Sequence, residues 1–114
     1  MPKAYRQVQR APLDVFANRV LGDDVFMCRT HDISTEALRF RRLLEPERAA
    51  RQVQMEFQLP GTREIIWAHG EIVREPGERS VVVRFLSMAE RHRGLIDAYV
   101  RQARRNRRRA AKVR

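Results

Sequence analysis

The sequence predicts a mainly β domain: an antiparallel barrel or closed sandwich of six short strands, followed by one amphipathic C-terminal helix. Short runs in which apolar and polar side chains alternate recur through the first 86 residues, as in strands with one buried face. Gly or Pro turn signals separate several of these runs. After residue 86 the apolar residues recur at three- and four-residue steps, which is the period of a helix.

The six expected strands are short and joined mostly by tight turns, as in barrels and sandwiches. They are expected at residues 13–20, 25–30, 37–42, 52–59, 64–74 and 80–86. The clearest is the run QVQMEFQL at 52–59, in which every second side chain is apolar. Gly70, in the middle of the longest run, predicts a bend or a bulge in that strand.

The helix is expected from about Met88 into the Arg-rich end of the chain. Its apolar stripe would consist of Leu95, Ile96, Tyr99, Val100 and Ala103. Such a stripe can pack on the barrel or on another subunit, which leaves room for a homo-oligomer formed through the helix. Ser87 with Glu90 three residues later predicts a capping box at the start of the helix.

A chain of 114 residues with 43% hydrophobic and 33% charged side chains fits one soluble domain. We expect a single domain over 1–103, with a flexible N-terminal arm at 1–11, a barrel at 12–86 and the helix at 87–103. Residues 104–114 would continue the helix as a basic tail. We expect no membrane span, because no apolar run reaches the roughly 18–20 residues that cross a bilayer.

A cytoplasmic location is expected from two features of the sequence. The N-terminus lacks the apolar segment of a secretory signal. The single cysteine, Cys28, has no partner for an internal disulfide, so a reducing compartment is its natural setting. Cys28 lies within an expected strand, and we interpret it as a core residue.

The net charge of +10 is concentrated at one end of the chain. Residues 101–114 contain seven Arg, one Lys and no acidic residue, a charge of +8. The other 100 residues carry 16 basic and 14 acidic side chains, a net charge of +2. The tail could meet nucleic acid, an acidic membrane surface or an acidic protein, or simply be solvated. Without interleaved aromatic residues or a recognition module, nucleic-acid binding would be non-specific and salt-sensitive.

The sequence does not favour an enzyme, and we predict no catalytic residue, metal site or cofactor. His31, His69 and His92 are scattered over an expected turn, strand and helix, without HExxH or CxxC spacing. A Cys28–His31 dyad is disfavoured, because residues three apart on a strand point to opposite faces. The five glycines form no phosphate-binding loop.

Two polar segments are candidates for ligand binding. In the first, Asp32 could accept local N–H groups as in an Asx-turn, Ser34 could offer its hydroxyl to a ligand, and the small Ala37 would allow close approach. Alone, this segment is an ordinary β-turn. The second segment, RQVQR, places Arg6 and Arg10 four residues apart directly before the first strand. The same spacing of arginines occurs three more times in the tail, so only its position singles this pair out.

Taken together, these segments resemble a PilZ domain, the bacterial receptor module for cyclic di-GMP. The matching stretches are RQVQR at 6–10, APLDVFA at 11–17, DISTEALRF at 32–40, GEIVRE at 70–75 and VVVRFLSM at 81–88, followed by the helix. The resemblance extends to about residue 103. It implies a six-stranded antiparallel barrel with a C-terminal helix. It also implies a cyclic di-GMP site, whose residues here would be Arg6, Arg10, Asp32, Ser34 and Ala37.

By this resemblance the chain is a cyclic di-GMP receptor whose N-terminal arm folds onto the barrel with the ligand and signals to an unidentified protein partner. Guanine presents O6 and N7 as a bidentate acceptor for the guanidinium of Arg6 or Arg10. Tyr5 stands where the family often has another Arg, and it is a possible additional contact with the ligand.

Two alternative functions stay open at this point. Ala37 replaces the usual Gly of the family motif, at a cost of about 1 kcal/mol if the position needs positive φ. The chain could therefore be a PilZ-like adaptor that no longer binds cyclic di-GMP and acts through protein contacts. The other alternative is non-specific nucleic-acid binding through the tail.

Overall fold

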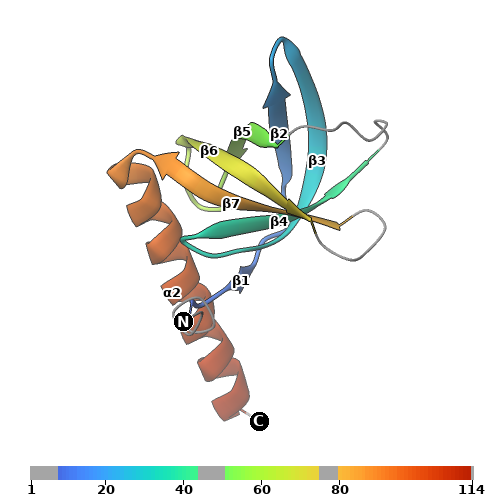
Figure 1. The fold of residues 1–114 in the computed structure, drawn as a ribbon. Helices are drawn as coiled ribbons and strands as arrows, with labels where there is room; N and C mark the ends of the chain where they lie inside the picture. The colour runs from blue at the N-terminus through green and yellow to red at the C-terminus, as the bar shows by residue number, and fades with distance from the viewer. Residues whose placement is uncertain (1–7, 44–50, 75–79, 114) are drawn as a thin grey trace, which may run out of the picture.

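The computed structural model describes residues 8–43, 51–74 and 80–113 (Figure 1). Within these ranges the chain forms seven strands and a long C-terminal helix. The elements are β1 (Ala11–Pro12), β2 (Phe16–Leu21), β3 (Asp24–Ile33), β4 (Ala37–Arg42), β5 (Gln52–Gln58), β6 (Ile65–Arg74), β7 (Ser80–Met88) and α2 (Glu90–Val113).

Strands β2 to β7 form a closed, six-stranded antiparallel barrel. Hydrogen-bonded neighbours follow the order β3, β2, β5, β6, β7 and β4, and the pairing of β4 with β3 closes the ring. The two residues of β1 pair with the end of β3 outside this ring of six. The predicted barrel with a C-terminal helix is therefore confirmed, and the open choice between barrel and sandwich is resolved.

The first strand was predicted to begin at residue 13, which is wrong. β2 begins at Phe16. In the residues just before Phe16, the side chain of the buried Thr30 in β3 takes the place of part of the regular backbone pairing between strands. Its hydroxyl donates to the carbonyl of Leu13 (2.6 Å) and accepts from the N–H of Val15 (2.9 Å). These backbone groups are thus satisfied by a side chain instead of a regular strand partner.

The predicted capping box of Ser87 and Glu90 is also wrong, because β7 continues to Met88. Ser87 is a strand residue that pairs with His69 of β6. The helix begins at Glu90, and the N–H of Arg93 donates to the carbonyl of Ala89 (3.0 Å). The residue just before the helix, Ala89, therefore occupies the N-cap position, and its methyl side chain cannot accept a hydrogen bond from the first turn.

The interior of the barrel is filled by the apolar side chains that alternate along each strand. The largest fully buried ones include Leu13, Ile33, Leu38, Phe40, Met55 and Ile66. Cys28 is fully buried among them, as the sequence predicts. The charged side chain of Arg19 also lies in this interior: its guanidinium is 5.4 Å from the ring centroid of Phe40 and 5.7 Å from that of Phe26.

Helix α2 packs on the barrel of its own chain along its first half. Ile96 and Val100 are buried, and the hydroxyl of Tyr99 donates to the carbonyl of Pro12 in β1 (2.6 Å). Burial also raises the pKa of Tyr99. The apolar stripe is thus covered within the chain, and beyond Ala103 the helix runs past the barrel (Figure 1). In the described ranges, no helix has the length and apolarity needed to cross a bilayer.

The first turn of α2 is held to the start of β6 by Glu64. Its carboxylate accepts from Arg91 (2.8 Å) and lies 3.1 Å from Nε2 of His92, whose Nδ1 accepts the N–H of Trp67 (3.2 Å). The hydrogen bond from Arg91, with a smaller contribution from His92, lowers the pKa of Glu64 below its ordinary value of 4.5.

A lowered carboxylate pKa stabilises the fold above the ordinary pKa, and this stabilisation is lost as the pH falls through the lowered value. Glu64→Gln should therefore reduce the urea midpoint at pH 6, and the difference from wild type should shrink steadily below pH 4.5. Urea denaturation at several pH values between 3 and 6 measures this. A difference that stays constant over the whole range would contradict the role given to Glu64.

Candidate functional site

A β-bulge in β3 brings Asp32 to the outer surface of the barrel. The register of β3 against β4 shifts between Thr30, which pairs with Phe40, and Asp32, which pairs with Arg39. Without this extra residue, Asp32 would follow the buried Cys28 and Thr30 into the core. The bulge instead leaves His31 and Asp32 both accessible and turns the next residue, Ile33, inward.

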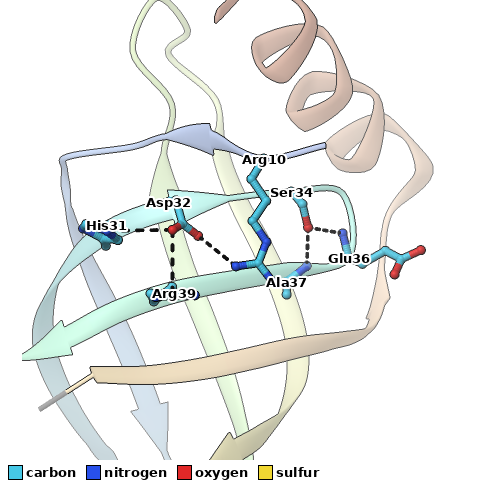
Figure 2. Close-up of polar contacts among 7 residues, drawn as sticks. All are labelled: Arg10, His31, Asp32, Ser34, Glu36, Ala37 and Arg39. Atoms are coloured by element: carbon cyan, nitrogen blue, oxygen red, sulfur yellow. Dashed lines mark hydrogen bonds and ion pairs between the residues drawn. The ribbon is translucent and has the colours of Figure 1, made fainter. Parts of the chain in front are cut away.

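The carboxylate of Asp32 is the centre of a small charged cluster (Figure 2). One oxygen lies 3.9 Å from the guanidinium of Arg10, which precedes β1, and the other lies 3.7 Å from Arg39 of β4. Nε2 of His31 is 3.9 Å from the same carboxylate. The cluster thus joins the N-terminal segment to two adjacent strands of the barrel.

Ser34 folds the turn that follows β3. Its Oγ accepts from the N–H groups of Glu36 and Ala37 (3.1 Å each), and its own N–H donates to the carbonyl of Ala37 (2.9 Å). The side chain is buried. The bonding to local N–H groups that was predicted for Asp32 is therefore performed by Ser34, because Asp32 still belongs to the strand.

The turn is also fastened to two other elements. The carbonyl of Glu36 accepts from the N–H of Phe85 in β7 (2.8 Å), and the carbonyl of Thr35 accepts from the guanidinium of Arg93 in α2. The turn beside the charged cluster is therefore connected directly to the first turn of the C-terminal helix.

Ala37 is the first residue of β4 and lies on the same outward face as Arg39. Among the described residues, only glycines have positive φ. The cost of about 1 kcal/mol foreseen for an alanine in the left-handed region therefore does not arise here.

An open groove of about 640 Å³ lies beside the Asp32 cluster. Its lining residues are Pro12, Asp14, Arg29, Thr30, His31, Arg39, Phe40, Arg41 and Ser80. Two of these residues, Asp14 and Arg29, form an ion pair (2.6 Å), and this hydrogen bond lowers the pKa of Asp14. Arg39 and Arg41 leave the groove with a net positive charge. Its volume is in the range of pockets that hold small molecules.

Three residues of this site, His31, Arg39 and Arg41, were missed by the sequence analysis, although the sequence carried a signal for each. If the strand alternated regularly from Cys28, the apolar Ile33 would face solvent and the charged Asp32 would face the core. This unfavourable arrangement indicates a bulge between Cys28 and Asp32. Arg39 and Arg41 occupy alternate positions of a strand that was predicted with its exact bounds. Their side chains therefore had to share its outer face.

Two predicted ligand residues, Tyr5 and Arg6, lie outside the described residues. Of the other four, Arg10 and Asp32 are brought together, whereas Ser34 and Ala37 lie in and just after the adjoining turn (Figure 2). The described residues contain no cluster of three or more His, Cys, Asp or Glu side chains that could hold a metal ion.

Chemically, the groove and its edge suit an anionic ligand with planar acceptor groups. Guanidinium groups bind phosphates and bidentate acceptors such as the O6/N7 edge of guanine. Asp32 can orient the neighbouring Arg side chains or accept an amino group of the ligand.

Comparison with known proteins identifies the fold and the family. The barrel and helix superpose on the Bacillus subtilis inhibitor of motility MotI/DgrA with a TM-score of 0.78 at 13% sequence identity, covering 90% of this chain but only 53% of that one. The uncharacterized Legionella protein Lpg0364 gives a TM-score of 0.55 at 14% identity, with 87% and 97% of the two chains covered. No curated protein sequence matches the chain. The PilZ-domain family model matches residues 4–102, and this chain therefore belongs to the PilZ-domain family.

Proposed function

We propose that this chain is a cytoplasmic, non-enzymatic receptor that binds cyclic di-GMP in the groove beside Asp32. The observation that carries the proposal is the convergence of Arg10, Asp32 and Arg39 at the edge of a basic groove. PilZ domains are regulatory binding and adaptor domains, and the charge and size of this groove suit a ligand with two phosphates and two guanines.

Arg10 is placed to exchange its partner when the ligand arrives. Its separation of 3.9 Å from Asp32 is that of an ion pair without a hydrogen bond, so Asp32 orients the guanidinium without occupying its donors. The side chain is also half-exposed. In our proposal Arg10 and Arg6 bond guanine edges and phosphate, Arg39 and Arg41 bind phosphate from the barrel, and Tyr5 stacks on a base.

The ligand would fix the N-terminal segment against the barrel and so present a new surface to a protein partner. Ligand binding could also change the position of α2 through the turn at 34–36, because Arg93 of α2 and Phe85 of β7 both donate hydrogen bonds to this turn. A regulatory output of this kind agrees with the description of the structural neighbour MotI/DgrA as an inhibitor of motility.

The alternative of an adaptor without ligand binding depended on Ala37. Since Ala37 does not have positive φ, backbone strain gives no support to this alternative. What remains is one methyl group on the outward face at the start of β4, which can crowd a ligand but leaves Arg10, Asp32 and Arg39 in place.

Calorimetric titration tests the proposed function. We expect cyclic di-GMP to bind with micromolar or tighter affinity. Cyclic di-AMP should bind at least about fivefold more weakly, because adenine offers a donor where guanine offers O6, and one bidentate Arg–guanine contact contributes about 1–3 kcal/mol of discrimination. Absence of heat with cyclic di-GMP at micromolar protein would refute the proposal, and equal affinities for the two dinucleotides would refute guanine recognition by arginine.

A further inference from the structure

The end of α2, residues 104–113, forms a basic rod that does not line the groove. After Ala103, the last residue of the apolar stripe, the helix continues for ten residues to Val113, a length of about 15 Å. It extends beyond the barrel in Figure 1. The side chains from Arg105 to Ala111 are exposed, and no acidic residue follows Asp97 in the sequence.

The arginines of this rod occupy a wide arc around the helix axis. At about 100° per residue, Arg104, Arg105, Arg108 and Arg109 fall within an arc of about 140°, and Arg107 widens it to about 200°. Most of this arc faces away from the side on which Ile96 and Ala103 contact the barrel. Arg101 is not included, because it forms an ion pair with Asp97 (3.1 Å).

The helix also places like charges next to one another. Arg104 with Arg108, and Arg105 with Arg109, stand four residues apart, a spacing at which like charges repel one another and destabilise a helix. Positive charge near the C-terminus is favoured by the helix dipole, which offsets part of this cost. A polyanion that approaches the rod would remove the repulsion and stabilise the helical form.

We propose that this rod binds double-stranded DNA without sequence specificity, through its arginines between Arg104 and Arg109. An arc wider than a half-circle suits a groove with phosphates on both walls better than a flat surface. The major groove of B-form DNA, about 12 Å wide, admits an α-helix. Guanidinium forks match phosphate oxygens, and such contacts position a protein without reading bases.

Two other polyanions fit less well. A membrane-surface helix carries large apolar residues opposite its basic face, whereas residues 104–113 offer only Ala110, Ala111 and Val113. A-form RNA has a major groove too narrow and deep for side chains to enter.

Fluorescence anisotropy with a labelled 20-base-pair DNA duplex tests this proposal on the 114-residue chain, in the absence of cyclic di-GMP. Affinity should fall with salt between 50 and 200 mM, with a log–log slope of about −4.5 for five phosphate contacts. Arg105→Gln/Arg109→Gln should flatten the slope by about 1.8. Arg51→Gln/Arg63→Gln, which removes the same charge from exposed sites outside the rod, should leave it near the wild-type value.

Glutamine has nearly the helix propensity of arginine, so circular dichroism should show α2 intact in the test variant. The proposal is overturned if the duplex does not bind at 50 mM salt and micromolar protein, or if the two double variants lose affinity equally. It is also overturned if an RNA duplex of the same sequence, or vesicles with one-third anionic lipid, bind more tightly than DNA. The groove residues are intact in both variants, so failure here leaves the proposed cyclic di-GMP site untouched.

Discussion

Gly70→Ala should destabilise the protein by about 3 kcal/mol, the upper end of the usual cost of overpacking. Gly70 follows the register shift in β6, where the strand lies against β7. A Cβ at this position would stand 2.3 Å from Cγ1 of Val83 and 2.7 Å from the carbonyl oxygen of Arg84. The backbone oxygen cannot move without disturbing the β6–β7 ladder. Urea denaturation measures the loss.

Gly94→Ala is the matched control, because it adds the same methyl group to α2, where nothing lies within 4 Å of the added Cβ. Replacing a helical glycine by alanine should stabilise the protein by up to about 1 kcal/mol. The two substitutions are therefore expected to have opposite signs. Equal stabilities of the Gly70→Ala variant and the wild type would contradict the close contact between β6 and β7.

Arg10→Ala combined with Arg39→Ala should weaken cyclic di-GMP binding by at least about 100-fold. A hydrogen bond to a charged group contributes about 1.5–3 kcal/mol, and each 1.4 kcal/mol corresponds to a factor of ten. The two residues reach Asp32 from different elements, so the double variant removes both the arm contact and the barrel contact. Calorimetric titration measures the affinity.

Arg63→Ala provides the control for this pair, because Arg63 is exposed before β6 and does not line the groove. Its affinity for cyclic di-GMP should equal that of the wild type within a factor of two. If Arg63→Ala weakened binding as much as the double variant, the effect would come from net charge alone, and the assignment of the site would be wrong.

Most of the fold follows from local patterns in the sequence. The alternation of apolar and polar residues predicted most of the strands. The strand at 37–42 was predicted with its exact bounds, because Leu38 and Phe40 face the core while Arg39 and Arg41 point outward. The errors occurred where side chains or long-range pairing decide the boundaries. Thr30 satisfies the backbone before β2, and pairing with β6 extends β7 through Ser87.

The candidate site was predictable in part for the same reason. The motif pointed to Arg10 and Asp32, but the presence of Arg39 in the cluster depends on the register of β3 against β4. That register is set by the bulge at His31 and by closure of the barrel, and both are tertiary effects. The burial of Ser34 inside its turn likewise depends on contacts from β7 and α2, which local sequence does not contain.

An assigned ¹H–¹⁵N NMR spectrum of the full chain, titrated with cyclic di-GMP, tests the proposed ligand site most directly. We predict that the amide signals of Arg10, His31, Asp32, Arg39 and Arg41 shift together as the ligand saturates. Smaller shifts should reach Thr35 and Arg93 through their hydrogen bond. Shifts confined to residues 104–113 would place the ligand on the basic rod and contradict the assignment of the groove.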